Sequence, residues 1–187
     1  MADQAYYMAC LDLEGRGCLV VGGGRVGIEK ASGLLECGAS VTVVAPQADP
    51  ELAELPVEWL RRSYRASDLD GRFLVVAATS NRSVNRRVFA DAEARSLFCN
   101  VVDTPELCSF ILPAVHREGP IALAVSTGGA SPALAQHLRE LLAEQIRPEH
   151  ADLAERLRSL RPWVKAHYPT YEERRDYFRQ LVEEALP

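Results

Sequence analysis

Apolar residues recur along the first part of the chain in short continuous runs, and polar or helical stretches separate these runs. Such runs are typical of strands that are buried on both faces, as in a parallel sheet. The pattern predicts strands over residues 19–21, 40–45, 57–60, 73–78 and 97–102. The short run at 57–60 alternates between apolar and polar residues, as a strand would.

Helical spacing fills the intervals between these runs. A glycine-rich turn at residues 22–27 leads into a helix that we expect to run to about Gly38. A second helix is predicted over residues 82–94, and the polar residues at 79–81 can cap its start. The alternation of strands and helices predicts an α/β fold with a Rossmann-type doubly wound parallel sheet. Pro46 and Pro50 stop regular structure, so we expect the second strand to end before Pro46.

The pattern changes beyond this sheet. Residues 109–115 and 121–126 are strand-like and flank an expected hairpin turn at 116–120. Ser131 and Pro132 then provide an N-cap and a first helical residue for a helix that reaches about residue 146. Helical patterns continue to the end of the chain, including residues 171–185.

Gly22, Gly24 and Gly27 form a G-x-G-x-x-G motif between a predicted strand and a predicted helix. In dinucleotide-binding folds the first glycine permits the turn, the second lets the backbone approach a pyrophosphate, and the third lets helix and strand pack closely. The phosphates would lie at the positive end of the helix dipole. Similar turns occur without a ligand, but the strand-helix-strand context favours a nucleotide. Ile28 excludes a kinase-type P-loop, because a lysine would have to follow the last glycine.

The end of the second strand leaves the choice between NAD and NADP open. Val44, Ala45, Pro46 and Gln47 stand where many dinucleotide-binding folds carry the acidic residue that binds the ribose. Gln47 could accept a hydrogen bond from a ribose hydroxyl, whereas Arg25 would favour a 2′-phosphate.

Composition and charge narrow the functional classes. The chain has 187 residues, 25% of them charged, and a net charge of -5, which indicates neither a nucleic-acid-binding surface nor a disordered acidic chain. No apolar run approaches the roughly 20 residues of a membrane span, and no basic leader is apparent, so we expect a cytoplasmic protein without membrane partners. The five cysteines form no C-x-x-C pair, which favours buried free thiols and no permanent metal site. An anionic substrate would need a local basic site.

Four loops follow the carboxyl ends of predicted strands: residues 22–27, 45–47, 79–81 and 103–105. Ligands of doubly wound sheets bind at these ends, so we expect the four loops to border one crevice. Asp103 in the last loop either caps a turn or supplies a carboxylate for proton transfer. His116, beside Arg117 in the expected hairpin turn, is either a proton carrier for the site or a solvated turn histidine.

Five stretches of the chain carry a family likeness: VVGGGRVGIEK, SVTVVAP, VVAATSNRSVN, FCNVVDTPELCSFILPAV and ALAVSTGGASPALA. On these stretches, which span about residues 19–142, the chain resembles the precorrin-2 dehydrogenase family, whose domain opens the siroheme synthases. The resemblance implies NAD-dependent oxidation of precorrin-2 to sirohydrochlorin in siroheme biosynthesis. In some members insertion of Fe²⁺ follows, and Co²⁺ is a variant. The resemblance also implies a homodimer.

Family roles carry over to matching residues. Asp103, in VVDTP, corresponds to the essential carboxylate that the family assigns to base chemistry in dehydrogenation and chelation. The residues expected to contact NAD are Gly22, Gly23, Gly24, Arg25, Val26, Pro46, Gln47 and Thr79. The residues expected to contact precorrin-2, a tetrapyrrole rich in carboxylates, are Ser126, Thr127, Gly128 and His116. Thr127 stands where some relatives carry a serine that can be phosphorylated.

Three parts are expected along the chain: an NAD-binding Rossmann domain over residues 1–112, a small α+β dimerisation and substrate segment over 113–147, and a helical C-terminal domain over 148–187. The alternative to an enzyme is an NAD(H)-sensing regulatory module without catalysis. A sensor would need neither the Asp103-Thr104-Pro105 sequence nor the loop from Ser126 to Pro132.

Overall fold

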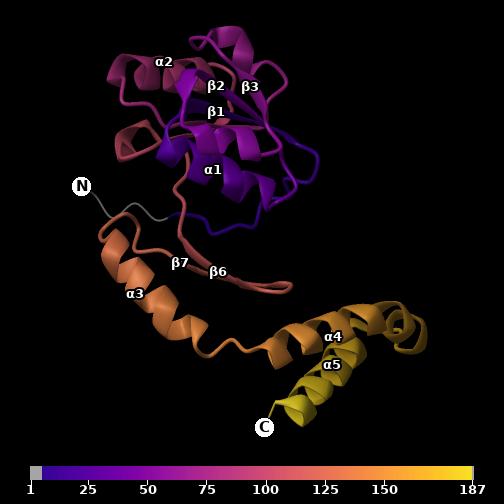
Figure 1. Cartoon of the computed structure of the whole chain (residues 1–187). Helices are drawn as coiled ribbons and strands as arrows, with labels where there is room; N and C mark the ends of the chain where they lie inside the picture. Colours follow the sequence, from indigo (N-terminus) through magenta and orange to yellow (C-terminus); the bar gives the residue numbers. More distant parts are fainter. Residues whose placement is uncertain (1–5, 187) are drawn as a thin grey trace. The chain divides into compact units, whose positions relative to one another are not determined.

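The computed structural model describes residues 6–186, and the chain divides after Ile111 into two compact units. Figure 1 shows their elements along the chain. Within the described residues, no helix is both long enough and apolar enough to cross a membrane. The expected further boundary between residues 147 and 148 stays a prediction.

The first unit is built on a five-stranded parallel sheet in the order β3-β2-β1-β4-β5. Its strands are β1 (Gly17–Gly23), β2 (Ser40–Ala48), β3 (Glu58–Leu60), β4 (Leu74–Ala77) and β5 (Phe98–Val101). The chain moves outward from β1 to β3 on one side and from β4 to β5 on the other, so the direction of winding switches between β1 and β4. The predicted Rossmann-type sheet is confirmed, and ligands of such sheets bind at this switch point.

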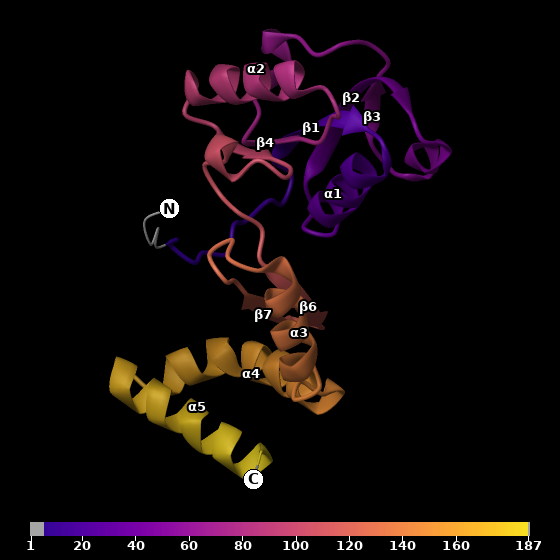
Figure 2. The ribbon, with the colours of Figure 1, turned by 90° about the vertical axis from the view of Figure 1, so that its left-hand side faces the viewer.

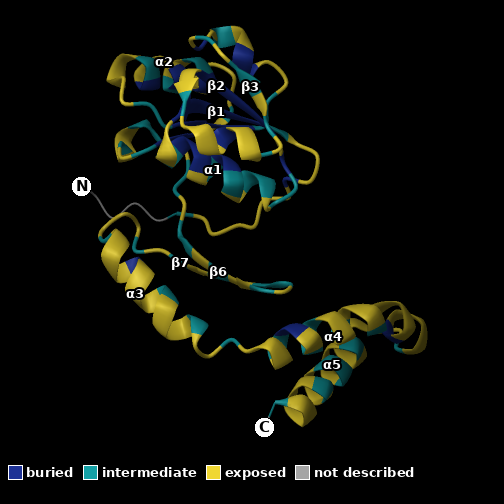
Figure 3. Ribbon diagram, viewed as in Figure 1, coloured by how far each residue is buried: buried dark blue, intermediate teal, exposed yellow. Residues whose placement is uncertain are grey.

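Helices cover both faces of the sheet, as the turned view in Figure 2 shows. They are α1 (Arg25–Leu35) and α2 (Arg82–Glu93), and three short 3₁₀ helices join the elements: η1 (Pro50–Glu54), η2 (Ala66–Leu69) and η3 (Pro105–Leu107). Successive residues of β1 point to opposite faces, so Val20 packs with Ile28 of α1 while Leu19 packs with Val88 of α2. Figure 3 shows the buried residues concentrated in this sheet.

Strand β2 continues past Pro46 to Ala48, so the expectation that the strand ends before this proline is wrong. The ladder between β1 and β2 pairs Val21 with Val44 and then Gly23 with Ala48, with a register shift between the two pairs. Pro46 falls within this bulged stretch, where no ladder hydrogen bond requires its missing N–H. A bulge set by the partner strand leaves no signal in the local sequence.

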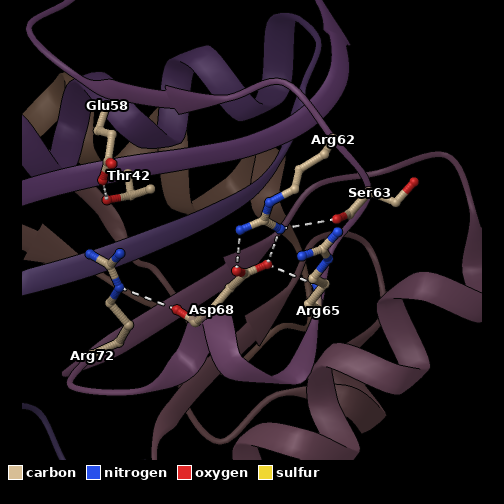
Figure 4. A network of polar contacts seen from close by, with 7 residues as sticks. All are labelled: Thr42, Glu58, Arg62, Ser63, Arg65, Asp68 and Arg72. Carbon is tan, nitrogen blue, oxygen red and sulfur yellow. Dashed lines mark hydrogen bonds and ion pairs between the residues drawn. The ribbon is translucent and has the colours of Figure 1, made fainter.

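A buried carboxylate anchors the connection from β3 to β4, as drawn in Figure 4. Asp68 accepts hydrogen bonds from both terminal nitrogens of Arg62, at 2.6 and 2.9 Å, and from the backbone N–H of Arg65 at 2.8 Å. The Arg72 side chain donates to the Asp68 carbonyl oxygen at 3.2 Å. Burial alone would raise the pKa of the Asp68 carboxyl, but the bonds from Arg62 and the Arg65 amide outweigh it and hold this pKa below its ordinary value.

The second unit consists of a hairpin and three helices. The antiparallel strands are β6 (Ala114–Glu118) and β7 (Ile121–Val125), and the helices are α3 (Pro132–Ala143), α4 (Pro148–His167) and α5 (Tyr171–Ala185). Helix α3 packs on both strands, and α4 packs on α5. The Ser131 hydroxyl accepts a hydrogen bond from the Leu134 amide at 3.2 Å, which confirms the predicted cap.

Two expectations for the hairpin are wrong. Residues 109–113 form no strand, because hydrogen bonds hold Ser109 against β5. The Ser109 amide donates to the Cys99 carbonyl oxygen at 2.8 Å, and the Cys99 amide donates to the Ser109 hydroxyl at 2.8 Å. The turn is also shorter than expected, since strand β6 extends through Glu118 and only Gly119 and Pro120 connect the strands. Gly119 has a φ of 53°, which suits a two-residue hairpin loop.

Candidate functional site

The glycine turn between β1 and α1 has the geometry that its spacing predicts. Gly22 has a φ of 122°, and a side chain there would overlap the Ala78 carbonyl at the end of β4. A Cβ at Gly27 would overlap the Gly22 carbonyl oxygen, so this glycine lets α1 approach β1. Both positions are therefore fixed by packing within the chain.

Gly24 differs, because a Cβ built there meets no atom within 4 Å. Gly24 is the N-cap of α1, no side chain caps the helix, and its first turn contains no acidic residue. The first amides of a helix, here those of Arg25 and Val26, have no partner within the helix and bind anions well. No atom of the chain therefore blocks the approach of a pyrophosphate at Gly24, and its contact with the cofactor stays a prediction.

The end of β2 lies against this turn. The Asp49 amide donates to the Gly23 carbonyl oxygen at 2.9 Å, and a side chain at Gly23 would collide with Ala48. Pro46 and Gln47, which were expected to contact NAD, are exposed at the same strand end. Because β2 ends at Ala48, the acidic residue Asp49 directly follows the strand. The sequence did not indicate this position, because the strand was expected to end at Ala45.

The loop after β4 is held to α2 by an asparagine that the sequence did not single out. The Thr79 hydroxyl lies 2.6 Å from Asn85 Oδ1, and Asn85 Nδ2 donates to the Thr79 carbonyl oxygen at 2.9 Å. Asn81 caps α2 by accepting from the Ser83 and Val84 amides. In the sequence, Asn85 is recognisable only as a polar residue next to the apolar face of the predicted helix. The Thr79 hydroxyl and carbonyl oxygen are both engaged within the loop, and contact of Thr79 with a cofactor stays a prediction.

Asp103 occupies a tight turn after β5 and has a φ of 56°, a conformation that aspartate tolerates better than most residues. The Thr104 amide closes the turn by donating to the Val101 carbonyl oxygen at 3.2 Å. The Cys108 sulfur lies 3.3 Å from the Val101 nitrogen and 3.3 Å from the Thr104 carbonyl oxygen. Burial raises the pKa of the Cys108 thiol, so it stays protonated and holds both ends of the turn.

Asp103 and Thr79 line one pocket of about 470 Å³ at the carboxyl ends of β4 and β5. Its polar and charged lining residues are Thr79, Ser80, Arg82, Asn85, Arg86, Asp103, Thr104 and Glu106. The volume is within the usual range for small-molecule sites, about 300–1,000 Å³. The structure thus brings together two of the loops that the sequence placed at one crevice, and it adds two arginines that the sequence did not indicate.

The four residues expected to contact substrate belong to the second unit, in the loop before α3 and in β6. The Thr127 hydroxyl accepts from the Ser131 amide at 3.0 Å, and Ser126 accepts from the Gly128 amide at 3.2 Å. The Thr127 hydroxyl also donates to the Ser131 carbonyl oxygen at 3.1 Å, so these bonds shape the loop. Their contact with substrate stays a prediction.

His116 lies in the middle of β6 and is half-buried, so it is not a solvated turn residue. Its Nε2 atom is buried and has no hydrogen-bond partner within residues 6–186, and the same holds for Arg139 Nε on α3. A buried ring nitrogen without a partner is costly and marks a position that a further ligand or chain could satisfy.

The cysteines are free thiols, and Cys18 and Cys99 are buried as predicted, whereas Cys10 is exposed, contrary to that prediction. Burial raises the pKa of the Cys99 thiol to about 12. Among the described residues, no group of three or more His, Cys, Asp and Glu side chains is arranged to hold a metal ion.

Comparisons with known proteins agree with this geometry. Residues 9–114 match the family described as "Putative NAD(P)-binding", and residues 118–145 match the central part of sirohaem biosynthesis proteins. The chain is 44% identical over 175 residues to siroheme synthase 3 of Aeromonas hydrophila and 43% identical over 175 residues to siroheme synthase of Pseudomonas entomophila. These alignments cover 91% of the chain but only 37% and 38% of the two relatives, so the chain spans less than two fifths of their length.

A solved structure described as SirC, precorrin-2 dehydrogenase, has the same fold over most of the chain. It superposes with a TM-score of 0.78 and 28% sequence identity, covering 95% of this chain and 89% of that one. The likeness therefore includes the second unit as well as the Rossmann domain.

Proposed function

Because the chain belongs to the NAD(P)-binding family of siroheme biosynthesis proteins, we propose that it catalyses the NAD-dependent oxidation of precorrin-2 to sirohydrochlorin. The observation that carries the proposal is the position of Asp103, in a pocket at the carboxyl ends of β4 and β5 next to the strand that bears the glycine turn. A sensor would need the glycine turn but not a carboxylate in this place.

The glycine turn and the end of β2 hold the dinucleotide in this proposal. The amides after Gly24 bind the pyrophosphate, and Gln47 and Asp49 face the ribose that follows. An acidic residue at this place favours the free ribose hydroxyls of NAD over the phosphate of NADP. When bound, NAD supplies the hydride acceptor of the reaction.

Asp103 handles the proton in this proposal. Dehydrogenation of precorrin-2 transfers a hydride to NAD and releases one proton, and the Asp103 carboxylate takes that proton from the ring. The turn held by Cys108 and Thr104 fixes the position of the carboxylate, so the base is oriented before the substrate arrives. Ser126, Thr127, Gly128 and His116 contact the tetrapyrrole from the second unit.

We also propose that the enzyme is a homodimer formed through the second unit. Helix α3 exposes Leu134, Leu138, Leu141 and Leu142, at 37–48% of their surface. Four exposed leucines on one helix form an apolar surface that a second copy would cover. The free buried thiols of Cys18 and Cys99 fit a cytoplasmic location, where disulfides are rare.

Metal insertion is a second candidate activity, favoured by the likeness to siroheme synthases. Insertion of Fe²⁺ or Co²⁺, as substrate, into sirohydrochlorin requires removal of pyrrole N–H protons, and Asp103 can accept them. Supplying sirohydrochlorin and either ion tests this activity separately from dehydrogenation, through the change in the absorbance spectrum of the macrocycle.

The dehydrogenase proposal is tested by mixing the protein anaerobically with NAD and precorrin-2. We expect NADH and sirohydrochlorin to form in equal amounts. If the protein binds NADH but never reduces NAD in the presence of precorrin-2, the chain is an NAD(H)-sensing module instead.

A further inference from the structure

The first turns of α2 present two arginines to the pocket that contains Asp103. Arg82 is the first residue of the helix, Arg86 lies one turn later, and both line the pocket. In the part of the chain that the structure describes, no ion pair or side-chain hydrogen bond involves either guanidinium. By contrast, Arg87 on the same helix pairs with Asp91 at 3.7 Å and lies over the Tyr64 ring. Of the three arginines of α2, the two that line the pocket are thus the two without an ion pair among the described residues.

Two cations at this end of a helix are unfavourable for the helix itself. The start of a helix carries a partial positive charge, so a nearby cation destabilises it unless an anion is present. Helix α2 has no acidic residue in its first turn to offset Arg82. Asp103 and Glu106 also line the pocket, yet neither forms an ion pair with Arg82 or Arg86 among residues 6–186. The positive charge in this wall is therefore available to a ligand.

We propose that Arg82 and Arg86 bind peripheral carboxylates of the tetrapyrrole and so hold its oxidised edge against Asp103, an inference that rests on the proposed function. Residues four apart on a helix are neighbours, with Cβ atoms about 5–6 Å apart. The two guanidiniums can therefore receive the acetate and the propionate of one pyrrole ring. Each guanidinium can make two parallel hydrogen bonds to a carboxylate, which fixes orientation as well as charge.

The pair also resolves a problem of charge. The chain has a net charge of -5, so a substrate with many carboxylates is repelled by the molecule as a whole and needs a local cationic site. The helix start with Arg82 and Arg86 supplies such a site next to the proposed base. It sets the position of the ring relative to Asp103, so we expect it to govern affinity for substrate rather than the rate of proton transfer.

Equilibrium binding of stable porphyrins to the full chain tests the pair without turnover. Uroporphyrin carries an acetate and a propionate on every pyrrole, whereas coproporphyrin lacks the acetates. We expect the Arg82→Gln and Arg86→Gln variants each to weaken uroporphyrin binding roughly tenfold, with a smaller loss for coproporphyrin. The matched control is Arg87→Gln, which removes a neighbouring arginine of the same helix outside the pocket and should bind uroporphyrin like the wild type. NAD affinity, measured for every variant, should stay within about twofold and reports an intact fold.

Turnover separates this proposal from the previous one. In the double variant we expect the KM for precorrin-2 to rise by one to two orders of magnitude, with kcat nearly unchanged. Equal uroporphyrin affinity in the double variant and in Arg87→Gln, or a wild type that does not bind uroporphyrin, would overturn the arginine site. If the wild type binds uroporphyrin through these arginines but never reduces NAD, the arginine site is supported and the proposed dehydrogenase activity is contradicted.

Discussion

Thr79 and Asn85 bond one another in both directions, across the carboxyl end of β4 and the first turn of α2. The Thr79 hydroxyl lies 2.6 Å from Asn85 Oδ1, and Asn85 Nδ2 donates to the Thr79 carbonyl oxygen at 2.9 Å. Asn85 is only 7% exposed, so water does not compete for these bonds. The pair fixes a loop that lines the same pocket as Asp103.

Replacing Asn85 by alanine should loosen this loop. The change leaves two polar groups of Thr79 without their buried partner, and we expect the free energy of unfolding to fall by about 1–3 kcal/mol. Urea unfolding measures the loss, and the KM for NAD should rise because the loop moves. Glu93→Ala, an exposed change at the far end of the same helix, is the control and should alter stability by less than about 0.5 kcal/mol. An Asn85→Ala variant as stable as this control would show that the pair does not hold the loop.

The glycine turn allows folding and binding to be separated. Gly24→Asp places a carboxylate in the open space where the pyrophosphate is expected, so NAD affinity should fall by roughly 100-fold or more. Aspartate is also a better N-cap than glycine, and stability should be unchanged or slightly higher. Gly27→Ala should instead affect folding: its free energy of unfolding should fall by about 1–3 kcal/mol, because the added Cβ would overlap the Gly22 carbonyl. Calorimetric titration with NAD and urea unfolding of both variants provide the measurements. Unchanged NAD affinity in Gly24→Asp would place the cofactor elsewhere.

Asp68 should make the stability of the first unit depend on pH in the acidic range. Its pKa is lower in the folded chain than in the unfolded chain, where it is about 3.9, so its bonds to Arg62 and Arg65 stabilise the fold above that pH. This stability is lost as the pH falls below about 4 and through the folded pKa. In Asp68→Asn the increment should already be missing at pH 7, and the difference from wild type should shrink on acidification. A difference in urea midpoint that stays constant from neutral pH to pH 3 would contradict this assignment.

Much of this architecture could be predicted because its signals are local. The strands at residues 17–23 and 74–77 are continuous apolar runs, and the glycine spacing requires a particular turn wherever it stands between a strand and a helix. Asp103 could be placed at a strand end for the same reason.

The features that escaped prediction depend on partners distant in sequence. The end of β2 is set by the pairing of Ala48 with Gly23, and this bulge is invisible in the proline-containing segment itself. Residues 109–110 look like a strand but are held to β5 by the bonds between Ser109 and Cys99. Arg82 and Arg86 read as ordinary exposed helix residues until the pocket between α2 and the Asp103 turn is known.

The proposed dimer can be tested on helix α3. Leu134, Leu138 and Leu141 follow one another at helical spacing and are exposed in the single chain. We expect the wild type to be dimeric at micromolar concentration in light scattering, and Leu138→Glu combined with Leu141→Glu to be monomeric because two carboxylates would be buried at the interface. Gln136→Glu, on the same helix, should leave the dimer intact. A monomeric wild type would contradict the proposed dimer.

The central claim is that Asp103 is the base for dehydrogenation of precorrin-2, and the most direct measurement is NADH formation by Asp103→Asn. Asparagine keeps the size of the side chain and suits the same backbone conformation, so the turn after β5 should be preserved. Under anaerobic conditions with saturating NAD and precorrin-2, kcat should fall by about 10²–10⁴-fold relative to wild type, while the affinities for NAD and uroporphyrin stay the same. Wild-type turnover in Asp103→Asn would contradict the account and reduce Asp103 to a residue that shapes the turn.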